Sequence, residues 1–197
     1  MKQLIWIYDA IVFWLSVPDK IIKKETNFFN EESSILHVAP EQCFYSNFKS
    51  HFKKYITFDL ESPLADIKGD ICNLPFNDNQ FDYILCNHVL EHVYDDQMAM
   101  NEIFRVLRKG GIAILQVPID YNKEKTLDGR DIDDKKLRNK LFGQYDHLRM
   151  YGKDYFKKLN KTGFRSVNVN YLSTLTQEEI TKFSIKNAGT IPVCFKD

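Results

Sequence analysis

The string NHVLEHV at residues 87–93 holds two histidines and a glutamate in the order H-x-x-E-H. This order is the spacing of one class of zinc peptidase. On a helix, His88 and His92 would share one face with Glu91 beside them, so zinc ligation is geometrically feasible. The string therefore raises two readings, a metal site or a strand end that lines a ligand crevice.

The position of this string in the chain favours the second reading. It follows directly after the apolar run FDYILC (81–86), which reads as a strand, whereas the peptidase motif lies within a helix and needs a third ligand from elsewhere. Three further histidines have no ligand spacing relative to the pair: His37, His51 and His147. We therefore expect no metal.

Two acidic residues occupy ends of other expected strand segments. Asp59 closes the run KYITFDL (54–60), where an acid can accept hydrogen bonds from the vicinal hydroxyls of a ribose. Asp70 precedes Ile71, so its carboxylate could accept a hydrogen bond from an exocyclic amine while the isoleucine packs on an aromatic base. Either acid alone more often forms a turn or helix cap, but the two together suit an adenosine moiety.

The elements that must position these residues alternate along the chain from Ser34 onward. Short apolar runs are separated by helical or polar segments, which predicts β-α-β units. We expect an α/β fold: a Rossmann-like open, mainly parallel sheet with helices on both faces and an antiparallel C-terminal edge. The runs expected to form strands are 35–39, 54–60, 81–86, 112–118, 165–172 and 190–196, with helices over 95–109 and 154–163.

Four motifs in this order resemble those of class I S-adenosylmethionine-dependent methyltransferases. They are YITFDL, GDICNLPF, FDYILCNHVLEHV and EIFRVLRKGGIAILQVP, within residues 54–118. The pattern is most similar to the small-molecule enzymes of the type-11 kind, in a bacterial subgroup. The likeness covers most of residues 34–197.

The resemblance implies roles for individual residues and S-adenosylmethionine as cofactor. Asp59 and Leu60 would bind its ribose end, and Asp70 with Ile71 its adenine. The methionine end, near the transferable methyl, would be lined by Asn87 and His88. Glu91 and His92 would then begin the helix after the strand.

The first motif departs from the family pattern, in which an acid and a glycine-rich turn follow the first strand. Here the turn reads HVAPEQC, with His37 in place of the acid and no glycine. Glycine is used in such turns because it tolerates positive φ. Either the cofactor is blocked, or Ala39 and Pro40 form a different turn and the Glu41 carboxylate faces the amino group of the cofactor.

The segment 120–150 is the expected acceptor side of the site. Residues 120–140 alternate in charge and have few apolar side chains, so they form either an exposed, solvated segment or a lid. His147 is the candidate general base, with Tyr145, Asp146 and Arg149 as substrate contacts; a purely structural loop is the alternative.

Composition narrows the class of partner. The chain has 27 Lys and Arg residues against 27 Asp and Glu residues, so it lacks the basic field that nucleic-acid binding uses. We expect a small-molecule or glycan-like acceptor and no nucleic acid. The four cysteines form no C-x-x-C pair and are expected as free thiols in the cytoplasm.

Residues 1–26 are expected to form an amphipathic helical segment ahead of a domain at 27–197. The apolar run 4–17 is shorter than a membrane span and contains Asp9. It either packs on the domain or lies peripherally at the inner face of the membrane.

Two other functions compete with methyl transfer. A catalytically silent methyltransferase fold that serves as an interaction module would account for the missing glycines. A nicotinamide-dependent oxidoreductase is disfavoured because no G-x-G-x-x-G follows the first strand.

Overall fold

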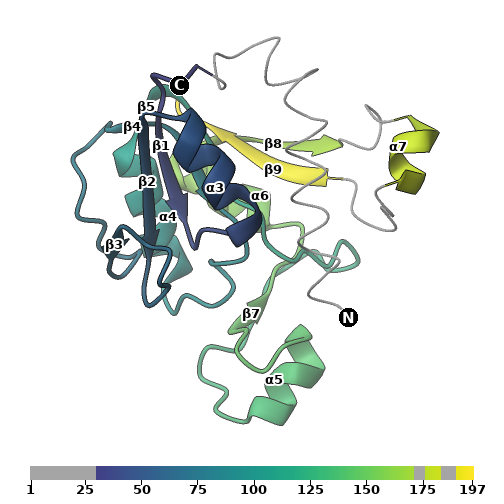
Figure 1. Cartoon of the computed structure of the whole chain (residues 1–197). Helices are drawn as coiled ribbons and strands as arrows, with labels where there is room; N and C mark the ends of the chain where they lie inside the picture. Colours follow the sequence, from purple (N-terminus) through teal and green to yellow (C-terminus); the bar gives the residue numbers. More distant parts are fainter. Residues whose placement is uncertain (1–29, 171–175, 183–189) are drawn as a thin grey trace.

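A computed structural model describes residues 30–170, 176–182 and 190–197. Its main feature is a seven-stranded sheet in the order β3-β2-β1-β4-β5-β9-β8 (Figure 1). The strands are β1 (Ser34–Val38), β2 (Lys54–Asp59), β3 (Ile67–Lys68), β4 (Phe81–Cys86), β5 (Leu107–Ile114), β8 (Arg165–Asn170) and β9 (Thr190–Phe195). The helices are α3 (Gln42–His51), α4 (Asp96–Val106), α5 (Lys135–Phe142), α6 (Tyr155–Thr162) and α7 (Gln177–Lys182).

The sheet is parallel from β3 through β5 and antiparallel at β9 and β8. The expected fold class, including its antiparallel edge, is confirmed. Alternate side chains of β1 enter different layers: Leu36 and Val38 join the main core with α4 and α6, whereas Ile35 and His37 face the layer of α3. Figure 1 shows α3 and α4 on opposite sides of the strands.

Helix α4 begins as the sequence predicts. Asp95 is its N-cap, because its side chain accepts a hydrogen bond from the Met98 N–H at 2.9 Å. The predicted end at Gly110 is wrong, since the helix ends at Val106 and β5 starts at Leu107. The physical reason is Lys196, whose buried ammonium donates to three carbonyl oxygens at this end: those of Phe104 (2.8 Å), Arg105 (3.3 Å) and Leu107 (2.7 Å).

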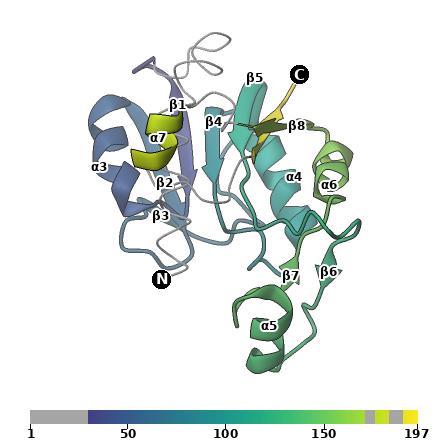
Figure 2. The same cartoon turned by 90° about the vertical axis from the view of Figure 1, so that its right-hand side faces the viewer.

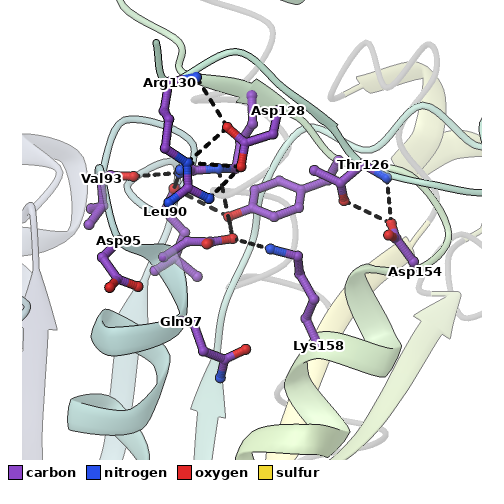
Figure 3. Close-up of polar contacts among 12 residues, drawn as sticks. Leu90, Val93, Asp95, Gln97, Thr126, Asp128, Arg130, Asp154 and Lys158 are labelled. Atoms are coloured by element: carbon purple, nitrogen blue, oxygen red, sulfur yellow. Dashed lines mark hydrogen bonds and ion pairs between the residues drawn. The ribbon is translucent and has the colours of Figure 1, made fainter.

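The segment 120–150 contains regular structure. A two-stranded ribbon joins β6 (Leu127–Asp128) to β7 (Arg149–Met150), and α5 lies between them. Both views show α5 and this ribbon projecting from one end of the sheet (Figures 1 and 2). Thr126 is fastened to the start of α6, because its N–H and hydroxyl both donate to Asp154 Oδ1 at 2.7 Å (Figure 3). These hydrogen bonds anchor the beginning of the segment to α6.

Two sequence predictions concern residues that the structure does not describe. The N-terminal helical segment, its boundary at residue 26 and the membrane contact through residues 4–17 all lie outside the described residues. Within the described ranges, no helix is long and apolar enough to cross a membrane. The four cysteines are free thiols, and Cys86 and Cys194 are buried in the sheet.

Candidate functional site

A cavity of about 600 Å³ opens at the carboxyl ends of β1, β2 and β4. The strand order changes direction between β1 and β4, and open α/β sheets bind ligands at such a switch point. Its volume lies within the range typical of small-molecule sites. Six of the predicted cofactor residues line it: Ala39, Asp59, Leu60, Asp70, Ile71 and His88.

Asp59 is the last residue of β2 and lines the cavity, and one of its carboxylate oxygens accepts hydrogen bonds from the backbone. Its Oδ1 accepts hydrogen bonds from the backbone N–H groups of Glu61 (2.8 Å) and Ser62 (2.7 Å). These bonds fix the carboxylate in an Asx turn and leave Oδ2 for a ligand. The structure therefore places Asp59 where a ribose hydroxyl could donate to it.

The next turn along the chain supplies the second acid and an apolar surface. Asp70 is exposed at the cavity, and its Oδ1 accepts from the Cys72 N–H at 2.8 Å. Ile71 is buried beside it, while Leu60 on the β2 side is 66% exposed. An exposed leucine at a cavity mouth is available to pack on a planar ring.

The turn after β1 accommodates its lack of glycine. Ala39 adopts φ +50°, in the left-handed region that favours glycine, and its N–H donates to the Phe58 carbonyl at 2.8 Å. His88, at the end of β4, also has a left-handed φ of +55°. Two non-glycine residues with positive φ at neighbouring strand ends mark a constrained wall, which is a common property of functional sites.

Glu41 does not line the cavity. Its carboxylate is held by the imidazole of His37 and by Asn87 Nδ2 at 3.0 Å, and His37 in turn contacts the Tyr55 hydroxyl at 2.7 Å. Burial alone would raise the pKa of Glu41, but the hydrogen bond and charge of His37 and the amide of Asn87 outweigh it and lower that pKa. Glu41 thereby connects the turn after β1 to Asn87, the residue that follows β4.

Two other predicted cofactor residues also lie behind the wall. Pro40 is buried after the turn, and Asn87 is 6% exposed. The amide oxygen of Asn87 makes no hydrogen bond to any described residue. Of the predicted cofactor set, Pro40, Glu41 and Asn87 thus support the wall from behind.

Residues 87–95 form turns, so the prediction that Glu91 and His92 begin a helix is wrong. The turns are held from below by Arg149, which is fully buried. Its guanidinium donates to the carbonyl oxygens of Leu90 (2.7 Å), Val93 (2.5 Å) and Tyr94 (2.9 Å). Arg149 is therefore a positioning residue, and the prediction that it contacts substrate is wrong.

A buried acid completes this support. Asp96 is 2% exposed, and it accepts from the Tyr151 hydroxyl at 2.9 Å and from Lys158 at 2.8 Å. Figure 3 shows Lys158 reaching from α6 toward the turn that carries Leu90 and Val93. The helix, the ribbon and the turn are joined by this network below the cavity.

The remaining candidates lie along the stretch before β7. His147 is buried and contacts His92, a cavity residue, with ring centroids 4.8 Å apart. Burial lowers the pKa of His147, as does the charge of His92, against the opposing effect of Glu91. Tyr145 is exposed and lies outside the cavity lining, and Asp146 Oδ2 lies 3.6 Å from His92 Nδ1.

Comparison with known proteins shows which family the segment around this cavity resembles. Residues 35–115 match the family model described as "Methyltransferase domain". This segment of the chain is similar to a methyltransferase domain. The matched range contains β2, β4, β5, all of β1 except Ser34, and every residue that lines the cavity.

Curated proteins similar to this chain match it over part of their length. An uncharacterised protein of Methanocaldococcus jannaschii is 27% identical over 119 residues, which are 60% of this chain and 54% of that protein. A demethylmenaquinone methyltransferase of Staphylococcus epidermidis is 44% identical over 61 residues, 31% of this chain and 25% of that protein. The chain thus spans about half, or less, of the length of the curated relatives it matches.

The fold is similar to that of solved methyltransferase structures. The crystal structure of an S-adenosylmethionine-dependent methyltransferase of Thermotoga maritima superposes with a TM-score of 0.57 at 16% identity, covering 98% of this chain and 92% of that one. The family implies S-adenosylmethionine as cofactor, and the cavity fits its nucleoside end. Asp59 Oδ2 would be available to a ribose hydroxyl, and the apolar side chains of Leu60 and Ile71 line the cavity where they could pack on a base.

Sequence reasoning missed the parts of the wall that come from outside the motifs. Tyr94, in the turn before α4, and Met98, in the first turn of α4, line the cavity and are 61% and 51% exposed. Neither has a sequence signal, because exposed apolar residues at a helix start are common. Only the placement of α4 beside β4 brings them to the cavity.

Proposed function

We propose that this protein is an S-adenosylmethionine-dependent methyltransferase that moves a methyl group to a small-molecule or glycan-like acceptor. The observation that carries the proposal is the cavity at the carboxyl ends of β1, β2 and β4, with Asp59 and Asp70 at successive turns within the matched domain. The chain's formal net charge of zero favours an acceptor that does not need a basic surface.

When bound, S-adenosylmethionine supplies a methyl group already activated on a sulfonium, so alignment and exclusion of water are what the protein adds. The chain provides alignment through a stiff wall: the left-handed turns at Ala39 and His88, and the Glu41 network behind them. Apolar side chains of Val38, Phe58 and Val89 lower the exposure of the cavity floor to water.

The test is calorimetric titration with S-adenosylmethionine and S-adenosylhomocysteine. The wild type is expected to bind saturably, and Asp59→Ala or Asp70→Ala to weaken binding by about 1 to 3 kcal/mol, the cost of an unpaired polar partner. Asp133→Ala is the matched control, since it removes an exposed carboxylate outside the cavity lining and should leave affinity unchanged.

The opposite result has a definite meaning. A folded wild type that binds neither compound would contradict the proposal and favour the interaction module. Binding to another macromolecule would then be the function to test.

A further inference from the structure

Three side chains with ligand atoms for a metal gather at the wall of the cavity. One such atom from each of Glu91, His92 and His147 lies within 4.8 Å of those of the other two. His147 is 55 residues from His92 in sequence, so no motif spacing predicts this group. It differs from the peptidase motif, because residues 87–95 are not helical and His88 is not a member.

The two imidazoles are oriented as metal-binding histidines usually are. His147 Nδ1 lies 3.1 Å from the Phe142 carbonyl oxygen, and His92 Nδ1 lies 3.3 Å from the Asp146 carbonyl oxygen. Each Nδ1–H can donate to its carbonyl, which leaves the Nε2 lone pair for a ligand. Metal-binding histidines almost always donate their other ring N–H in this way.

The side chain of Gln144 is consistent with this assignment. Its Nε2 lies 2.6 Å from His147 Nε2, and an amide nitrogen can only donate, so the imidazole nitrogen accepts. Gln144 is half-buried, and its amide must turn aside when an ion takes the lone pair.

Glu91 contributes a buried carboxyl group, one oxygen of which makes no hydrogen bond to a described residue. The residue is fully buried, Oε1 lies 3.3 Å from His88 Nδ1, and Oε2 makes no hydrogen bond to a described residue. Buried carboxylates are normally paired, hydrogen-bonded or bound to a cation. Oε2 is therefore a buried acceptor without a hydrogen bond to a described residue, which a bound cation would satisfy.

The backbone holds the two halves of the group together. The Leu148 N–H donates to the Glu91 carbonyl at 2.8 Å, directly beside His147. Arg149 fastens the same stretch to the carbonyls of Leu90 and Val93. The three ligands are thus fixed by contacts that do not depend on an ion, as a preorganised site requires.

We propose that Glu91, His92 and His147 bind one divalent transition-metal ion of the zinc type at the wall of the cavity. Two imidazoles and a carboxylate form a ligand set that suits zinc, and three protein ligands leave one position open in a tetrahedral site. His92 is the member that lines the cavity, so an acceptor in the cavity would reach the ion from that side.

The experiment uses the full chain, untagged and treated with a chelator. Calorimetric titration with zinc chloride is expected to show one ion per chain, and cobalt(II) to give the visible absorption of a four-coordinate site. His92→Ala and His147→Ala should each weaken zinc binding by about 100-fold or more. His51→Ala is the matched control, because His51 is exposed on α3 and is not a member of the group.

Further measurements distinguish loss of the metal site from loss of the fold. Circular dichroism and urea unfolding show whether each variant is folded, and X-ray absorption of the zinc-loaded wild type needs no variant. Imidazole and oxygen ligands alone are expected at the ion. Unsaturable zinc binding, sulfur ligands, or folded variants that bind zinc as the wild type does would each overturn the proposal. These readouts do not depend on S-adenosylmethionine, so failure of this site and failure of methyl transfer are distinguishable.

Discussion

Arg149 shows how burial assigns a role that residue type leaves open. An arginine in a polar stretch near a predicted site suits substrate binding, since its planar guanidinium has five donors. In the fold those donors face the backbone carbonyls of the turn after β4, away from solvent. The same chemistry therefore supports the cavity wall.

Arg149→Met is expected to lower the free energy of unfolding by about 3 kcal/mol or more. The reason is that three carbonyl oxygens would lose their donor, at about 1 kcal/mol or more each. Urea unfolding measures the change. Arg130→Met is the control: Arg130 pairs with Asp128 nearer the surface, where an ion pair contributes less than about 1 kcal/mol. Equal effects of the two substitutions would contradict this role.

Glu41 should make stability depend on acid pH. Its pKa in the folded protein is lowered from an ordinary value of 4.5, so the folded state favours the ionised carboxylate. The resulting stabilisation is fully present above pH 4.5 and is lost as the pH falls through the lower, folded-state value.

Urea unfolding of the wild type and of Glu41→Gln at a series of pH values measures this contribution. The wild type should be the more stable near neutral pH, and the difference should shrink steadily below pH 4.5. Glu61→Gln, at an exposed position, is the control and should give no such convergence. A difference that is constant with pH would show that the lowered pKa does not stabilise the fold.

At the scale of elements, two helices end in the same way with different surroundings. Gly143 after α5 has φ +83° and Gly163 after α6 has φ +117°, as left-handed C-terminal residues. A Cβ on Gly143 would meet no atom within 4 Å, whereas one on Gly163 would lie 2.8 Å from Phe104 Cζ. Phe104 packs edge-on against Phe164 in the core side of α4 and cannot move freely.

Gly143→Ala is expected to cost about 1 kcal/mol of stability through its positive φ alone. Gly163→Ala should cost about 2 to 4 kcal/mol, since the overpacking against Phe104 adds to the same backbone cost. Thermal and urea unfolding of the two variants compare the costs directly. A Gly163→Ala variant no less stable than Gly143→Ala would mean that the Phe104 ring gives way.

At the scale of the whole molecule, the sheet order places the site. Parallel β1, β2 and β4 end at one edge, so residues 39, 59 and 88, which are far apart in sequence, line one cavity. The segment 120–150 then crosses this end of the molecule and brings His147 against His92 (Figures 1 and 2). The cavity belongs to the matched domain, while the proposed metal site joins it to the following segment.

The sequence by itself determined most of the strands of the sheet, helices α4 and α6 apart from the end of α4, and the acids at the cavity. Short apolar runs predict strands, and parallel strands share a carboxyl edge, so the local pattern predicts Asp59 and Asp70 there, while His88 comes from the resemblance to methyltransferases. The Asp95 cap and the Gly163 helix end were also readable, since each depends on a side chain or a φ preference within one turn.

Only the tertiary structure decided the features that depend on distant partners. Lys196 ends α4 three residues early, Arg149 is a buried support, and Glu41 is held behind the wall by His37 and Asn87. The proximity of His147 to Glu91 and His92 likewise depends on the tertiary structure. Apart from the local His37–Glu41 contact, these features result from contacts across tens of residues, and burial and charge pairing at that range leave no periodic pattern in the sequence.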